Sequence, residues 1–73
     1  MKLSKEFITP NDVMPPPPEF IMESTDREKL KRKAEALARE EYELLEFMWG
    51  FEGNDTGYTE LTVENQCRFV IKP

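Results

Sequence analysis

The chain has 73 residues, with 10 lysines and arginines against 15 acidic residues, and its formal net charge is -5 at pH 7. It contains one cysteine and no histidine, which excludes an internal disulfide and argues against a zinc site or a histidine-dependent active centre. A chain this short forms one domain at most and can hardly enclose the pocket of roughly several hundred Å³ that substrates occupy. We therefore expect a protein that is not an enzyme and that carries no cofactor.

Residues 1–24 hold five of the six prolines. The run Pro15–Pro18 predicts a stiff polyproline II segment, whereas the apolar residues that recur around it are unusual for a disordered tail. The pattern indicates an extended arm that lies either on the rest of its own chain or in a groove of another protein. The expected anchors of this arm are Phe7, Ile8, Val13, Met14, Phe20 and Ile21.

Residues 25–49 have the only long helical period in the chain. Thr25 and Glu28 fit a capping box, and Gly50 is suited to end the helix. Apolar residues recur at spacings of three and four, and toward the end they surround the helix. We expect the end of this helix to form a packed hub built on Leu44, Met48 and Trp49.

The charges of the predicted helix are divided, with a basic first half and an acidic second half. Lys29, Arg32 and Lys33 in the basic half form a candidate docking patch. Two alternatives follow from the same division. Two antiparallel copies could pair their opposite halves in a homodimer, or the basic stretch 27–33 could contact nucleic acid phosphates.

The last 24 residues begin with a glycine-rich loop at 50–57 that does not complete a calcium site, because Val63 stands where a bidentate glutamate is needed. We expect no metal. In the stretch 58–72, Val63, Cys67 and Ile71 fit a short C-terminal helix. The same stretch also reads as two strands that flank Glu64-Asn65-Gln66, which leaves a C-terminal β-hairpin as the alternative.

These expectations combine into a mainly α protein, with an arm at 1–24 and a small helical domain at 25–73; with the hairpin alternative it would be α+β. The predicted function is a small acidic interaction module, an accessory subunit or inhibitor of a larger protein or multi-subunit assembly. The alternatives are a structural homo-oligomer, including a component of a viral or other large assembly, and a nucleic-acid binder. The N-terminus lacks the apolar core of a signal peptide, and no apolar run suits a membrane span, so a cytoplasmic location, with a viral or mobile-element origin as one option, is expected.

Overall fold

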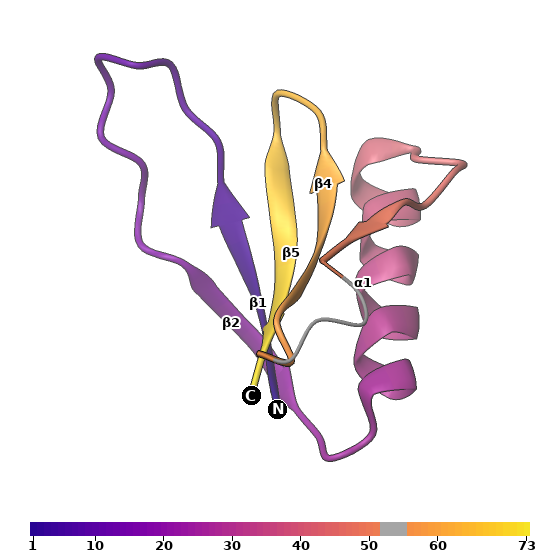
Figure 1. Ribbon diagram of the computed structural model, residues 1–73. Helices are drawn as coiled ribbons and strands as arrows, with labels where there is room; N and C mark the ends of the chain where they lie inside the picture. The colour runs from indigo at the N-terminus through magenta and orange to yellow at the C-terminus, as the bar shows by residue number, and fades with distance from the viewer. Residues whose placement is uncertain (52–55) are drawn as a thin grey trace.

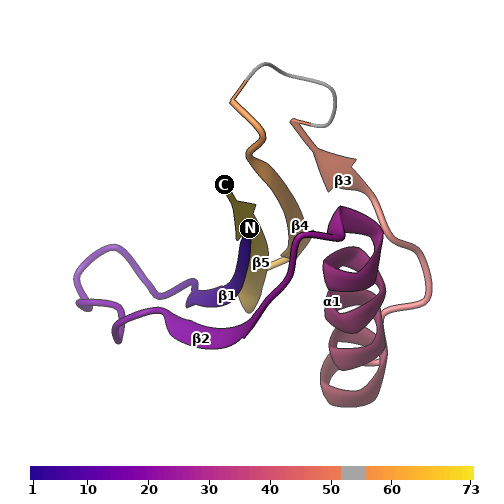
Figure 2. The same ribbon diagram turned by 90° about the horizontal axis from the view of Figure 1, so that it is seen from below.

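The computed structural model describes residues 1–51 and 56–73. Within them, five antiparallel strands form one sheet in the order β2-β1-β5-β4-β3, and one helix lies against it. The strands curve around the helix, which covers one face of the sheet (Figures 1 and 2). The elements are β1 (Lys2–Phe7), β2 (Glu19–Glu23), α1 (Arg27–Tyr42), β3 (Trp49–Gly50), β4 (Thr59–Val63) and β5 (Cys67–Lys72).

The first and last strands lie side by side in the sheet. β1 pairs with β5 along its whole length, from Lys2 opposite Lys72 to Phe7 opposite Cys67. The ladder continues past the strand end, where the N–H of Ile8 donates to the carbonyl of Gln66 at 3.0 Å. On its other side β1 pairs with β2, so the sequence-distant ends of the chain form one continuous sheet.

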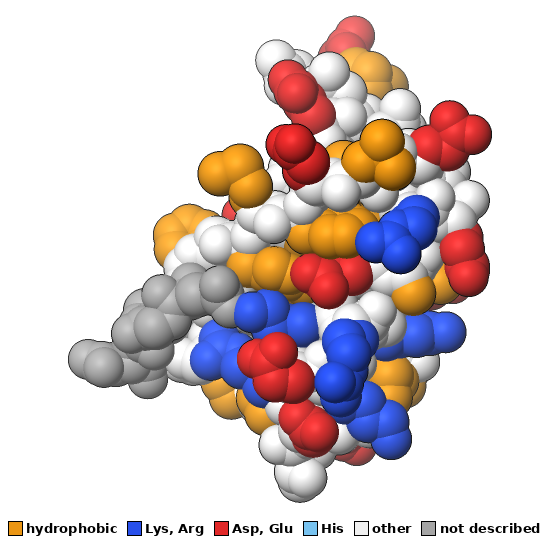
Figure 3. Space-filling view, turned by 90° about the vertical axis from the view of Figure 1, so that its right-hand side faces the viewer, with side chains coloured by type: hydrophobic (Ala, Val, Ile, Leu, Met, Phe, Trp, Pro, Cys, Tyr) orange, Lys and Arg blue, Asp and Glu red, His pale blue; other side chains and the backbone are white. Residues whose placement is uncertain are grey.

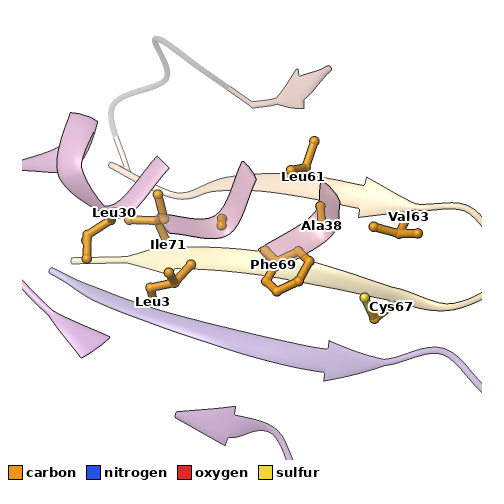
Figure 4. Packing of buried hydrophobic residues seen from close by; sticks show 9 residues of the cluster. Leu3, Leu30, Ala38, Leu61, Val63, Cys67, Phe69 and Ile71 are labelled. Atoms are coloured by element: carbon orange, nitrogen blue, oxygen red, sulfur yellow. The ribbon is translucent and has the colours of Figure 1, made fainter. Parts of the chain in front are cut away.

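The core lies between α1 and the face of the sheet that the helix covers. Because side chains alternate across a strand, every second residue of the three middle strands points at the helix (Figure 4). The sheet supplies Leu3, Thr59, Leu61, Val63, Cys67, Phe69 and Ile71, and the helix supplies Leu30, Ala34 and Ala38, all of them buried. The small alanines let the helix approach the strands closely, and at roughly 25 cal/mol per Å² of apolar surface this layer is the main stabilising feature of the fold.

The opposite face of the sheet is largely polar. Arg68 and Glu60 form a loose ion pair at 4.0 Å, and Lys72 lies 3.6 Å from Glu6. The Tyr58 hydroxyl donates to Glu60 at 2.6 Å. Burial, together with this carboxylate, raises the pKa of Tyr58 to about 12.

The predicted helix exists but is much shorter than 25–49. Its N-cap is Asp26 rather than Thr25, since the Asp26 carboxylate accepts from the N–H groups of Glu28 and Lys29. It ends where Glu43 takes a left-handed backbone with φ of 56°, well before Gly50. Strands of five or six residues span about 17–20 Å, so a helix of about 36 Å would carry its apolar last turns past the sheet into solvent.

The mainly α fold is therefore wrong, and the chain is α+β. The expected short C-terminal helix is also wrong, whereas the hairpin alternative matches β4 and β5 with their turn at 64–66. The apolar residues of 63–71 fit both the helical period and the alternation of a strand. The strand is favoured because its alternation also buries Leu61 and Phe69. The arm at 1–24 is likewise divided, since 2–7 and 19–23 are strands and 8–18 form the long loop between them.

The structure bears on two smaller expectations. The loop expected at 50–57 lies partly outside the described residues, because 52–55 are not among them. In the described parts of the chain, no helix has both the length and the apolar character that crossing a bilayer requires.

Candidate functional site

Among the described residues, the strand β2 forms one open edge of the sheet, with no strand beyond it (Figure 1). Its pairing with β1 shifts between Leu3 and Ser4, so Ile21 is the extra residue of a β-bulge. Ile21 and Met22 both pack against the core, whereas Phe20 is 60% exposed. The edge thus presents one large apolar side chain to solvent, with Glu19 and Glu23 at its two ends.

The register identifies which backbone groups of β2 face outward. The N–H of Ser24 donates to the carbonyl of Met1 at 3.0 Å, and residues of an antiparallel pair alternate between bonded and non-bonded positions. Lys2 and Ser4 therefore direct their backbone groups toward β5, away from β2. Glu23 and Phe20, which lie opposite them, have their N–H and C=O groups directed to the open edge.

A hollow of about 310 Å³ lies between β2 and α1. Leu37 and Ile21 give it an apolar part, and charged side chains from β1, β2 and α1 surround them. Its lining consists of Lys5, Glu19, Phe20, Ile21, Lys33, Leu37 and Glu41.

A buried lysine connects this hollow to the core. Lys5 is 7% exposed, and its Nζ lies 2.8 Å from Oε2 of Glu41 and over the rings of Phe7 and Tyr42. Burial by itself would lower the pKa of Lys5, but its hydrogen bonds to Glu41 and Tyr42 outweigh burial and raise it. Lys5 is therefore held as a cation and is unsuited to act as a nucleophile or a base.

The thiol of Cys67 lies beside this cluster and is fully buried. Burial raises its pKa, against the lowering effect of a hydrogen bond with Tyr42. A buried, protonated thiol is inert. Among the described residues, no group of three or more cysteine, aspartate or glutamate side chains is placed to hold a metal ion.

The loop between β1 and β2 extends away from the body of the molecule (Figures 1 and 2). A turn orders its tip, where the N–H of Val13 donates to the carbonyl of Pro10 and the Thr9 hydroxyl donates to the carbonyl of Val13. Val13 is 52% and Met14 91% exposed. The prolines 15–18 are all exposed and connect this tip to β2.

Of the six expected arm anchors, the structure leaves three available. Val13, Met14 and Phe20 are exposed, so they do not lie on the rest of their own chain. Phe7 and Ile8 are instead half-buried where β1 ends beside β5, and Ile21 packs on the core. Sequence reasoning missed the charged residues that line the hollow beside Phe20 and Ile21, above all Lys5, Glu19 and Glu41. Isolated charged residues carry no periodic signal of burial.

The expected packed hub is only partly present. Leu44 and Trp49 pack against the core cluster, but Met48 is 84% exposed. The indole N–H of Trp49 donates to Glu35 at 3.1 Å, and Lys31 lies over its ring at 5.3 Å. These contacts attach β3 to the helix after the chain has reversed.

The expected basic patch lies on the outer face of α1. Lys29 and Arg32 are exposed there, and Lys33 is exposed beside the hollow that it helps to line. Figure 3 shows blue side chains gathered on the lower part of this face with acidic side chains among them. Arg27, from the same stretch, is occupied, since its guanidinium donates to the carbonyl of Gly57 at 3.2 Å. The patch is therefore small and mixed in charge.

Comparison of the chain with protein-family models, with curated proteins and with solved structures found no match.

Proposed function

We propose that this chain is a small, non-enzymatic protein-binding module that docks on a larger protein through its N-terminal hairpin and the adjoining face of α1. The observation that carries the proposal is the exposure of Met14 and Phe20 on a hairpin that the sheet holds in place. Large apolar side chains exposed on an ordered element are typical of interaction sites, and such residues dominate binding energy.

The occupied core weighs against the homodimer of antiparallel helices. Its apolar seam would have to come from Leu30, Ala34 and Ala38, which are fully buried against the chain's own sheet. Nucleic acid binding has little support, because the exposed cations of α1 are few and the net charge is -5. An intracellular location stays a prediction from the sequence.

A photocrosslinking experiment tests the proposed function. A benzophenone side chain is placed at position 14, at position 20 or, as the control, at the exposed position 62 on β4. We expect one protein to be crosslinked from positions 14 and 20 in cells of the source organism, and unlabelled wild-type protein to compete with it.

The crosslinked protein is then purified and its affinity measured. The double variant Met14→Ser/Phe20→Ser should bind at least about ten times more weakly, which corresponds to about 1.4 kcal/mol. The matched double variant Leu45→Ser/Met48→Ser removes two other exposed apolar side chains and should bind like wild type. Equal loss in both variants, or no competed crosslink, would contradict the proposal.

A further inference from the structure

We infer that the open edge of β2 is a strand-addition site for an extended segment of a partner protein that is apolar in the middle and basic at both ends. This inference rests on the proposed function and specifies its partner. It combines three features of the structure: outward backbone groups, a hollow beside them and the charges at the strand ends.

The backbone of the edge supplies the pairing groups. Phe20 and Glu23 direct their N–H and C=O groups outward, as the register with β1 requires. An extended peptide that pairs with such an edge gains affinity from main-chain hydrogen bonds. In the views of Figures 1 and 2, β2 is the outermost strand of the sheet, and the helix lies on its face rather than over its edge.

The hollow supplies a place for side chains of the added strand. An added strand continues the sheet, so alternate side chains point to the face that carries α1. On that face the hollow of about 310 Å³ presents Leu37 and Ile21. One or two apolar side chains of the segment would lie against them, and a neighbour would contact the exposed ring of Phe20, which borders the hollow.

The charges at the strand ends select the partner. Glu19 and Glu23 are both exposed, and the residues between them are Phe, Ile and Met. Lys5 and Lys2 lie opposite them on β1, but Lys5 is engaged by Glu41, and no ion pair within the described residues joins Lys2 to Glu23. Opposite charges across a strand pair are favourable, and like charges directly opposite are unfavourable. A segment with lysine or arginine at both ends therefore fits this edge.

The same charges disfavour a second copy of the chain as the occupant. Two β2 strands paired antiparallel about Ile21 would set Glu19 of each copy opposite Glu23 of the other. Four carboxylates would then meet at the two ends of the shared ladder. A homodimer through this edge is thus the outcome that the charges oppose.

Synthetic peptides test the inference. The probe is acetyl-Lys-Lys-Val-Thr-Val-Lys-Lys-amide, compared with the same peptide carrying glutamate for lysine and with one carrying proline for threonine. The proline peptide keeps the charge but cannot form a regular strand, so it separates strand pairing from attraction to an acidic protein. We expect the first peptide to bind at least ten times more tightly than either of the others.

Two variants of the protein locate the binding. Glu23→Pro removes the outward N–H without touching the ladder to β1, a position where edge strands tolerate proline, and should weaken binding at least tenfold with the fold retained. Glu19→Gln/Glu23→Gln should bind the basic and acidic peptides alike. The control Glu28→Gln/Glu40→Gln changes the net charge equally on the helix and should keep the preference.

The amides of Phe20 and Glu23 should shift and exchange more slowly with solvent when the basic peptide is bound. Equal affinity for the three peptides, shifts confined to α1, or a wild-type dimer that protects β2 would each overturn the inference. A competed crosslink from position 14 together with a failed peptide test would leave the docking function standing and remove only the strand-addition partner.

Discussion

The Nζ of Lys5 lies 2.8 Å from Oε2 of Glu41 and joins the first strand to the last turn of the helix, 36 residues away along the chain. The side chain of Lys5 is 9% exposed and that of Glu41 is 43% exposed. The pair is therefore asymmetric, with a buried cation and a carboxylate that solvent reaches. Loss of the carboxylate would leave the buried cation with less compensation.

Glu41→Ala should accordingly destabilise the protein more than Lys5→Met. The first variant leaves the buried charge of Lys5 without its partner. It should lower the free energy of unfolding by about 1–2 kcal/mol, after allowance for the exposure of Glu41. The second removes the charge and fills the same space, and should cost less than about 1 kcal/mol. Urea unfolding measures both, with Glu40→Ala on the exposed side of the same turn as the control. Equal costs for the two variants would show that the pair is no more than a surface contact.

Stability should fall as the pH rises from about 8.5, the ordinary thiol pKa, to about 12, the raised pKa of Tyr58. The pKa of Cys67 and that of Tyr58 are raised chiefly by burial. That of Lys5 is raised by its hydrogen bonds to Glu41 and Tyr42, in spite of burial. In Tyr42, the hydrogen bond with Lys5 lowers the pKa, but burial and the interaction with Cys67 together outweigh it, so the pKa is raised. The folded state thus holds more protons than the unfolded state, so this stability is present at neutral pH and is lost as alkali removes them.

Urea unfolding at about pH 7.5, 9 and 10.5 measures this loss. Absorbance of the tyrosinate ion checks one group separately. In Tyr42→Phe, which keeps only one of the two tyrosines, Tyr58 should titrate near pH 12 when folded and near about pH 10 in urea. A free energy of unfolding that is flat or rising over this range would contradict the assignment.

The division between core and surface makes a prediction that separates this fold from a long helix. Met48 is 84% exposed, so Met48→Ser should change stability by less than about 0.5 kcal/mol. Phe69 is fully buried in the central strand, so Phe69→Ala should cost about 3–5 kcal/mol. Thermal unfolding compares them, and Phe69→Leu provides a milder variant that stays folded. A large loss of stability in Met48→Ser would show that Met48 is packed, as expected from the sequence.

The sequence contained the start of the helix and its buried stripe, because Leu30, Ala34 and Ala38 follow a clear helical period. The end of the helix, in contrast, could not be predicted from the local sequence. Glu43 takes a left-handed backbone that glycine usually supplies, and the apolar run after it continues the same pattern. What ends the helix is the short length of the sheet beneath it, which is a tertiary property.

The sheet edge formed by β1 and β2 could not be predicted from the sequence for a related reason. β1 does alternate, with Leu3, Lys5 and Phe7 on one side, but a lysine on the inner side breaks the expected apolar pattern. Its position depends on Glu41, far along the chain, and no local rule anticipates that partner. The sequence left open whether Val13 and Met14, beside the proline run, lie on their own chain or on another protein, and the structure leaves both exposed.

The turn between β4 and β5 allows the hairpin to be tested against the helix that the same residues could form. Asn65 has a φ of 63°, and the N–H of Gln66 donates to the carbonyl of Val63 at 3.0 Å. Asparagine and glycine accept this backbone in a turn, whereas a β-branched residue does not. Asn65→Gly should therefore keep or slightly raise stability, and Asn65→Val should lower it by about 1–2 kcal/mol.

Chemical denaturation measures both variants, with Thr62→Val as the control. Thr62 is exposed on β4, where valine suits a strand, so this change should be close to neutral. In a helix the order would differ, because valine and asparagine have similar helix propensity and glycine lowers it by a few tenths of a kcal/mol relative to either. A stable Asn65→Val beside a weakened Asn65→Gly would thus argue for the helix and against the hairpin that places Cys67, Phe69 and Ile71 in the core.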